Sequence, residues 1–467
     1  MLRKRRKNNG GADRMYALDN AEAWQMFRQQ YWERSPSLFS MGKHRRSLPS
    51  ECLRSVVAAA DALSEGLDAE MRWLGSDGRV TRLESRDELT RNQLPLSSDV
   101  DFEHYWARRW THGKDLFLNV GNLQSHSAGL WTIVSDFLAE LYSIPGVREQ
   151  QAWCDVYIGR YEATPFGVHL DSASNFMFCL AGRKTIYLWE PEFYHQYMER
   201  DPRPWQQWIS HSVALELDNG QIAYWPSRFW HIATSQEYSV TMNIALYANR
   251  FAKKIVLPSF VQVVEEAAAA LAERLAGGNS LAAVAPVAPV AAGAAGAAGD
   301  ALPQEYSALR DALVGSWTAK KLASRLDYDL NRYWLRHISA CGFPKGLHRK
   351  KSQPLTNDDA LVARERTRIH CKEVEDPGTG TARLVLACNG HIADIDADPR
   401  IAELVNAISN DGPFTVAEIV ARFSGEARDD AGGTSVLEPE TVRDLLCLFW
   451  TWHALDTRDP RGRRGSA

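Results

Sequence analysis

The stretch that decides the fold runs from residue 167 to residue 192 and reads GVHLDSASNFMFCLAGRKTIYLWEPE. It opens with the pair His169-x-Asp171. In a β-strand, residues two apart point to the same side, so both side chains would enter one cavity while Leu170 faces elsewhere. A single His-x-Asp pair is common in proteins, so its meaning depends on the sequence around it.

Strand and turn signals follow this pair closely. We predict a metal-bearing strand, a strand over Asn175–Leu180, a tight turn at Gly182-Arg183, and a strand over Lys184–Trp189. The stretch therefore predicts a hairpin that carries a lysine.

A second histidine lies in LDNGQIAYWPSRFWHIATS, residues 217 to 235. This segment predicts a turn at Asp218-Asn-Gly, a strand over Gln221–Trp225, a break at Pro226 and then His231, with a last strand over Ser239–Tyr247. Two imidazoles and one carboxylate can occupy one face of an octahedral Fe(II) ion and leave three positions open. The sequence thus predicts an iron site made of His169, Asp171 and His231.

These motifs resemble the cupin-like JmjC hydroxylases, which include the asparaginyl hydroxylase of the hypoxia response and the bacterial ribosomal-protein oxygenases. The shared pattern is His-x-Asp, a basic residue fifteen positions after the first histidine, and a distal histidine after a proline-containing turn. Lys184 and the run from Pro226 to His231 complete it here. The resemblance implies an α+β fold with a double-stranded β-helix (jelly-roll or cupin) barrel and flanking helices. It also implies Fe(II), O2 and the cosubstrate 2-oxoglutarate.

The same resemblance assigns the residues around the cosubstrate. Lys184 would bind the far carboxylate of 2-oxoglutarate, because that group needs a cation at a fixed depth in the barrel. Asn175 and Asn243 stand near positions where the asparaginyl hydroxylase has asparagines close to the cosubstrate. Phe166 replaces the threonine that this enzyme carries three residues before its first histidine. Tyr157 is our candidate for the missing hydrogen-bond partner.

Composition is that of an ordinary globular protein. The chain has 467 residues, 45% hydrophobic and 24% charged, and a net charge of -4, which gives no electrostatic reason to expect nucleic acid as a partner. Seven scattered cysteines, none in a Cys-x-x-Cys pair, indicate reduced thiols in a cytoplasmic protein. No apolar run is long enough to span a membrane.

Composition shifts divide the chain into five segments. Residues 1–14 form a basic tail, 15–255 the catalytic domain, 256–276 a helix, 277–303 an Ala/Gly/Pro linker, and 304–460 a separate C-terminal domain.

The C-terminal domain is expected to be helical, with a small hairpin whose strands lie in 366–376 and 381–396. This arrangement resembles a winged-helix module, as in the bacterial ribosomal oxygenases and in leader-peptide-binding domains. The last helix, from Glu440, is apolar and contains one arginine, Arg443, so docking of a protein or peptide fits better than DNA binding. Homodimerisation through this domain is the alternative.

Three functions remain open on the sequence alone. The first is hydroxylation of a side chain in a protein or peptide substrate, the second is demethylation by the same iron chemistry, and the third is a non-catalytic cupin sensor fused to a winged-helix regulator. The full triad together with Lys184 favours an enzyme, because a sensor needs neither three ligands nor a lysine at that depth.

Overall fold

The computed structural model describes residues 16–67, 69–74, 80–83, 93–110, 116–147, 150–201, 204–247, 261, 265, 269, 319–428 and 434–458. The predicted basic tail and linker lie outside these residues, and of the predicted helix 256–276 only three residues are described, all helical. The chain divides into two compact units. Unit 1 is Met1–Ala248 with Ala340–Lys350, and unit 2 is Asn249–Ser339 with Lys351–Ala467.

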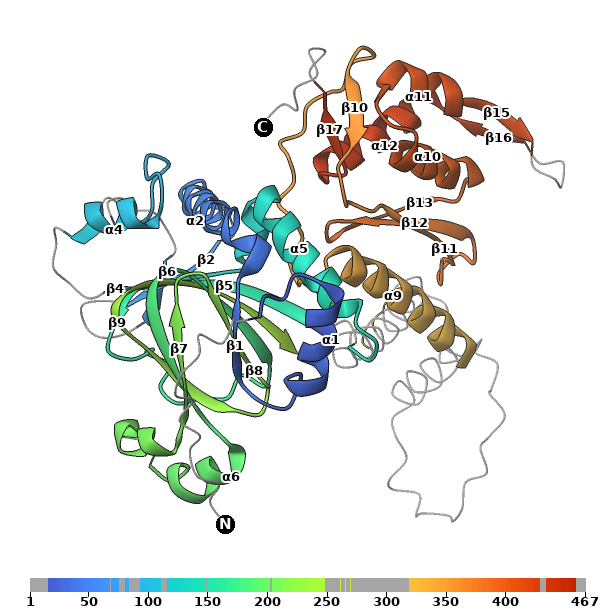
Figure 1. Cartoon of the computed structure of the whole chain (residues 1–467). Coiled ribbons are helices and arrows are strands. Elements are labelled where there is room, and N and C mark those ends of the chain that lie inside the picture. The colour runs from blue at the N-terminus through green and yellow to red at the C-terminus, as the bar shows by residue number, and fades with distance from the viewer. Residues whose placement is uncertain are drawn as a thin grey trace, which may run out of the picture. The chain divides into compact units, whose positions relative to one another are not determined.

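Unit 1 contains an antiparallel β-structure flanked by helices (Figure 1). Its strands are β1 (Ser37–Ser40), β2 (Glu70–Leu74), β3 (Val80–Arg82), β4 (Leu116–Gly121), β5 (Gln151–Tyr161), β6 (Ser174–Trp189), β7 (Val213–Asp218), β8 (Gln221–Trp225) and β9 (Trp230–Tyr247). Its longer helices are α1 (Ala21–Gln30), α2 (Leu48–Ser64), α4 (Phe102–Trp110) and α5 (Ala128–Tyr142). Short helical turns are η1 (Gly42–Arg45), η2 (Leu123–His126), α6 (Pro191–Phe193), η3 (Tyr194–Met198) and η4 (Trp205–His211).

The long strands β6 and β9 organise the sheets. They pair along most of their lengths, and the strand order is β1-β8-β6-β9-β5-β4-β2-β3, with β7 paired to the second half of β6. The predicted hairpin is wrong, because β6 is one continuous strand whose register with β9 shifts around Gly182. Gly182 has φ +67°, and a Cβ there would lie 1.7 Å from the carbonyl oxygen of Tyr238. Close approach to β9 thus makes a bulge where the local sequence suggested a turn.

Helices α1, α2 and α5 pack their apolar faces onto the outer side of the sheet. Helix α1 is capped by the side chain of Asn20, which accepts a hydrogen bond from the Ala23 N–H. The core between helices and sheet contains Trp24, Phe137 and Phe176. Because the helices cover this face of the sheet, the barrel interior lies on its other face.

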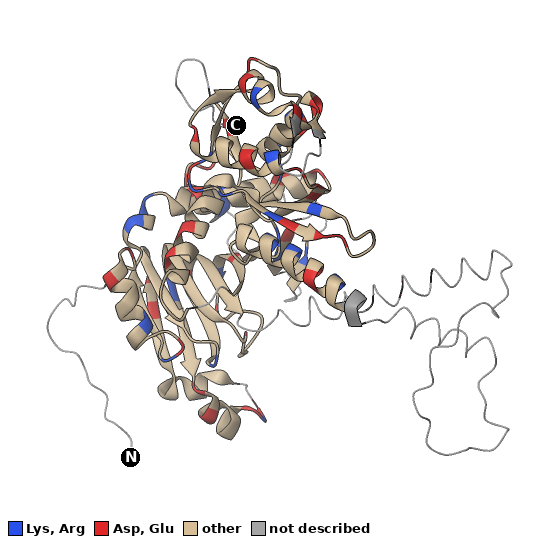
Figure 2. Ribbon diagram, turned by 90° about the vertical axis from the view of Figure 1, so that its right-hand side faces the viewer, with Lys and Arg blue, Asp and Glu red and all other residues tan. Residues whose placement is uncertain are grey.

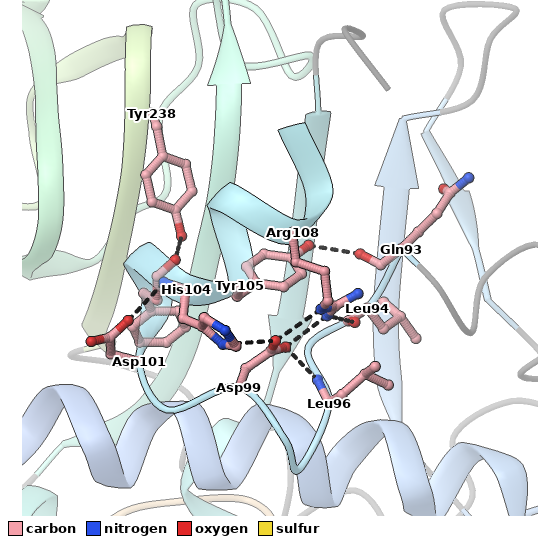
Figure 3. Close-up of polar contacts among 10 residues, drawn as sticks. Gln93, Leu94, Leu96, Asp99, Asp101, His104, Tyr105, Arg108 and Tyr238 are labelled. Atoms are coloured by element: carbon pink, nitrogen blue, oxygen red, sulfur yellow. Dashed lines mark hydrogen bonds and ion pairs between the residues drawn. The ribbon is translucent and has the colours of Figure 1, made fainter. Parts of the chain in front are cut away.

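Helix α4 contacts strand β9 at Tyr238. The Tyr238 hydroxyl donates to the carbonyl of Phe102 at 2.9 Å (Figure 3). The ring of Trp106 stacks on that of Tyr238 with 4.1 Å between the ring centroids. The loop before the helix is fixed by a buried ion pair, in which Arg108 donates twice to Asp99 at 2.8 and 2.6 Å. Arg108 holds the pKa of Asp99 below its usual value although burial acts to raise it.

Residues 340–350 belong to unit 1, although the sequence analysis placed them in the C-terminal domain. Phe343 and Leu347 are 2% exposed and lie in the same core as α5. The carbonyl of Gly342 accepts a hydrogen bond from the Ala152 N–H at 3.0 Å, next to the first residue of β5. The correction has a physical reason, since two large apolar side chains inside a basic loop find their cover on the barrel unit.

Unit 2 combines helices with three small sheets. Its elements are α9 (Ala319–Ser339), β10 (Ala360–Ala363), β11 (His370–Glu375), β12 (Ala382–Cys388), β13 (His391–Asp396), α10 (Pro399–Asn410), β14 (Phe414–Thr415), α11 (Val416–Phe423), β15 (Gly425–Arg428), β16 (Thr434–Leu437), α12 (Pro439–Thr451) and β17 (Leu455–Thr457). The expected two-stranded hairpin has a third strand, because Asn389 and Gly390 both have positive φ and form a tight turn between β12 and β13. A further hairpin, β15–β16, was not expected.

Two sequence predictions about composition can be compared with the described residues. All seven cysteines are free thiols. In the part of the chain that the structure describes, no helix is both long and apolar enough to cross a membrane.

Candidate metal centre

His169 and His231 lie opposite each other on two crossing segments. They form an isolated antiparallel bridge, in which the His169 N–H donates to the carbonyl of His231 at 3.0 Å and the His231 N–H donates back at 2.9 Å. Their rings come within 4.3 Å of each other, centroid to centroid. The predicted strand through His169 and Asp171 is wrong, since this stretch is a loop with that single bridge and β6 starts only at Ser174. The backbone bridge to His231, rather than a strand, holds His169 in place.

Asp171 completes a three-residue cluster. Its carboxylate oxygens lie 3.5 Å from Nε2 of His169 and 3.4 Å from Nε2 of His231, and the three ligand atoms lie within 4.8 Å of one another. Among the described residues this is the group of His, Cys, Asp and Glu side chains that could hold a metal ion. The structure thus brings together the three residues that the sequence analysis selected.

Backbone carbonyls set the tautomer of both histidines. Nδ1 of His169 lies 2.9 Å from the carbonyl oxygen of Gly167, and Nδ1 of His231 lies 3.2 Å from that of Phe229. A carbonyl oxygen only accepts, so each Nδ1 carries the proton and each Nε2 presents its lone pair to the cluster. The two rings therefore use the same support, a carbonyl two residues earlier.

Electrostatics keep the cluster in its ligating state. Burial lowers the pKa of His169, and the neighbouring His231 lowers it further. For Asp171, burial acts to raise the pKa, but the two imidazoles lower it overall. A neutral imidazole and an ionised carboxylate are the forms that bind a divalent metal. The donor set and its protonation states fit a 2-His-1-carboxylate site.

A cavity of about 400 Å³, including its open mouth, adjoins the cluster. Its lining contains the three ligands, polar residues and apolar residues, namely Tyr157, Thr164, Phe166, His169, Asp171, Met177, Lys184, Ile186, Trp225, His231, Ala233 and Asn243. The three ligands and Lys184 therefore share one cavity, as the sequence analysis expected.

Lys184 is buried inside this cavity without a carboxylate partner among the described residues. It is 1% exposed, its Nζ donates to Oγ1 of Thr241 at 2.9 Å, and it lies 4.8 and 5.5 Å from the ring centroids of Tyr157 and Tyr161. Burial lowers its pKa from 10.5 to about 7. A desolvated amine of this kind is ready to receive an anion.

Asn175 and Asn243, the two asparagines that the resemblance places near the cosubstrate, are hydrogen-bonded to each other. Asn243 donates from Nδ2 to Oδ1 of Asn175 at 2.8 Å, and Asn175 donates to the carbonyl of Ala173 in the loop behind Asp171. Asn243 lines the cavity, and its Oδ1 is buried without a hydrogen-bond partner in the structure. Asn175 supports the ligand loop, whereas Asn243 faces the open space.

Two threonines were missed by the sequence reasoning. Thr241 is completely buried and is the hydrogen-bond partner of Lys184. It stands two residues before Asn243 on β9, so strand alternation could have found it. Thr164 also lines the cavity, in the loop before the ligands, and no pattern identified it.

An exposed aromatic side chain, Phe166, lies at the edge of the cavity. Phe166, which takes the place of the family's threonine, is 42% exposed and packs against the His169 ring at 5.9 Å. Trp230, a residue next to the distal histidine, does not line the cavity but stacks on Tyr194 at 3.5 Å. Phe166 thus makes the entrance apolar without offering a hydrogen bond.

Comparison with known proteins supports the expected family. Residues 139–253 match a family model described as "JmjC domain". The match confirms the resemblance seen in the motifs and the cupin-type antiparallel fold. No curated protein matches the chain.

Solved structures that match the chain include several from Escherichia coli. Structures of YcfD, a ribosomal oxygenase, in complex with cobalt and succinic acid or with cobalt and 2-oxoglutarate, each show 16% identity and a TM-score of 0.46. A further ycfD structure shows 15% identity and a TM-score of 0.47. Each match covers 93% of this chain and 98% of the other.

Proposed function

Taking residues 139–253 as a JmjC domain, we propose that this chain is an Fe(II)- and 2-oxoglutarate-dependent dioxygenase that hydroxylates an amino-acid side chain in a protein or peptide. One observation carries the proposal. Two histidine nitrogens and a carboxylate converge at a cavity whose wall also contains a buried, uncompensated lysine.

His169, Asp171 and His231 would hold the iron. Three protein ligands leave positions open on an octahedral ion. When bound, Fe(II) with 2-oxoglutarate and O2 supplies the oxidising power that places an oxygen atom on an unactivated carbon. The carbonyls behind both Nδ1 atoms keep the imidazoles oriented toward the ion.

Lys184 would bind the far carboxylate of 2-oxoglutarate. In the ammonium form its Nζ can donate to that carboxylate while it keeps Thr241 as a second partner. The ring of Tyr157 lies beside the same nitrogen, and Oδ1 of Asn243, which is buried without a hydrogen-bond partner, would accept a hydrogen bond from a group bound in the cavity. Met177, Ile186 and Trp225 exclude water from the remaining wall.

Unit 2 would dock the substrate as a winged-helix-like module. Helix α12 buries Val442, Leu446 and Phe449, so its apolar face packs inward rather than entering a DNA groove. Figure 2 shows Lys and Arg interspersed with Asp and Glu over the described part of this unit, which suits a protein partner better than nucleic acid. Homodimerisation and the cytoplasmic location remain predictions.

The proposal is tested by mass spectrometry. Candidate protein and peptide substrates are incubated with purified protein, Fe(II) and 2-oxoglutarate, and the expected result is a product heavier by one oxygen atom, with succinate formed. A product lighter by one methyl group would indicate demethylation instead. Absence of succinate formation together with retained ligand binding would favour the sensor.

The matched variant is His169→Ala. It should abolish turnover and metal binding while the circular dichroism spectrum is kept, because β6 and β9 hold the sheet without this side chain. If metal affinity survives loss of both His169 and His231, the site is misassigned.

A further inference from the structure

The turn after α1 contacts both chain segments that supply ligands to the candidate metal centre. Figure 1 shows α1 beside β1 and β8. In this turn, Oε2 of Glu33 accepts a hydrogen bond from Oγ of Ser227 at 2.9 Å, and Oε1 accepts one from Oγ of Ser174. One carboxylate therefore joins two segments that lie far apart in the sequence.

The two serines stand close to the ligands. Ser174 is the first residue of β6, three positions after Asp171, and is 1% exposed. Ser227 lies in the turn after β8, four positions before His231. A shift of either serine would be passed along three or four residues of backbone to a ligand. Glu33 thus bridges the segments that contain Asp171 and His231, which β6–β8 pairing also holds together.

Backbone contacts hold the turn itself against the same segment. The Glu33 N–H donates to the hydroxyl of Tyr224 on β8 at 2.8 Å. Arg228 donates from Nη2 to the carbonyl of Arg34 at 3.1 Å. The turn is therefore attached to β8 and to the loop after it by bonds that do not involve the Glu33 carboxylate.

Backbone strain occurs at both ends of this connection. Glu33 has φ +52°, and Ser172, the residue after Asp171, has φ +53°. Residues other than glycine adopt this left-handed conformation at a cost, and they keep it only where surrounding contacts dictate it. Strain at these two positions indicates that the geometry between them is enforced rather than relaxed.

We propose that Glu33 is a positioning residue for the metal centre: its carboxylate clamps the Asp171 and His231 segments at the separation that metal binding needs. The inference rests on the proposed function, because it assigns a role relative to that metal. The competing explanation is that Glu33 only attaches α1 to the barrel. In that case its loss would lower stability and leave the metal centre unchanged.

The experiment measures Co(II) affinity and the visible spectrum of the Co(II)-loaded full-length protein, which reports coordination geometry. Glu33→Ala should weaken Co(II) binding by roughly ten- to a hundredfold, as loss of supporting partners does at other sites, and should alter the spectrum. Ser227→Ala, which removes one arm, should give a smaller loss in the same direction. Glu22→Gln, which changes an exposed carboxylate on α1, the helix before this turn, is the control and should match wild type.

The Co(II) affinity of the double variant distinguishes a clamp that acts through Ser227 from a general loss of stability. If Glu33 acts through Ser227, adding Ser227→Ala to Glu33→Ala should cost no further Co(II) affinity. Wild-type affinity and spectrum in Glu33→Ala would overturn the clamp, whatever its melting temperature. Should Glu33→Ala not fold, Ser227→Ala decides by the same criterion. If His169→Ala binds Co(II) like wild type, the proposed function itself fails, which is a distinct outcome.

Discussion

Lys184 should make 2-oxoglutarate binding depend on pH in a range where an ordinary lysine does not titrate. Its side chain is 1% exposed, and burial lowers its pKa from 10.5 to about 7. Among the described residues its neighbours include a hydroxyl, two aromatic rings and the Cys179 thiol, none of which holds the proton as a carboxylate would. The free protein is therefore only partly protonated at this position near neutral pH.

The sign and size of the effect follow from linkage. Only the ammonium form pairs with the far carboxylate, and binding of that carboxylate raises the pKa, so complex formation takes up a proton. Affinity is nearly full at about one pH unit below the free-state pKa of about 7 and is lost as pH rises through that pKa. The protonated fraction falls from about one half at pH 7 to about one eleventh at pH 8, so the apparent Kd rises about fivefold over this step and about fiftyfold by pH 9.

Isothermal titration calorimetry measures affinity and proton uptake together. 2-Oxoglutarate is titrated into protein loaded with Mn(II), an inert stand-in for Fe(II), in buffers with different ionisation heats. Uptake of about half a proton is expected at about pH 7, rising toward one at about pH 8. Lys184→Met should weaken binding by about ten- to a hundredfold at pH 7 and should flatten the pH dependence.

The control is Lys43→Met, which removes an exposed lysine and should leave both quantities unchanged. A wild-type Kd that is constant from about pH 7 to pH 9, without proton uptake, would refute the reasoning. Retention of the pH slope in Lys184→Met would show that another group titrates.

Three further variants test the fold around the site. Gly182→Ala should lower the free energy of unfolding in urea, because the new Cβ would meet the Tyr238 carbonyl at 1.7 Å; an equally stable variant would contradict the bulge. Phe343→Ala should lower the free energy of unfolding of unit 1 by about 3–5 kcal/mol. A chain ending near residue 277 should melt at a lower temperature than one ending at residue 350, since only the longer chain keeps this side chain. Equal melting temperatures would show that residues 340–350 do not contribute to the core of unit 1. Asn175→Ala should cost about 1–3 kcal/mol, because it leaves Asn243 and a loop carbonyl without their donor or acceptor, and unchanged urea unfolding would argue against that role.

Local sequence predicted the three clustered residues and strand β8. His169, Asp171 and His231 meet as expected, and β8 has the predicted bounds Gln221–Trp225. These features depend on short-range signals that a single strand or helix contains within itself. The third strand of the C-terminal sheet also has a local signal, since Asn389-Gly390 is a dipeptide typical of a hairpin turn between two strands.

The features that local sequence did not predict depend on contacts between residues far apart in the chain. Nothing within residues 340–350 shows that Phe343 and Leu347 pack on the barrel unit rather than on the domain that follows. The Glu33 connection joins residues that are 141 and 194 positions apart, so no local pattern contains it. The partner of Lys184 was missed for a different reason, because Thr241 reads as an ordinary strand threonine until the lysine is placed beside it.

The bulge in β6 explains how the lysine reaches the cavity at all. Before the bulge the odd-numbered residues Met177 and Cys179 face the barrel interior, and after it the even-numbered Lys184 and Ile186 do. Side chains alternate along a regular strand, so without the extra residue Lys184 would face the same side as Phe178, into the core beneath the helices. A hairpin turn at Gly182 would have reversed the chain instead. The register shift between Cys179 and Ala181, rather than the spacing from His169 alone, delivers the ammonium to the cavity, and Gly182 directly after it has a positive φ beneath the backbone of β9.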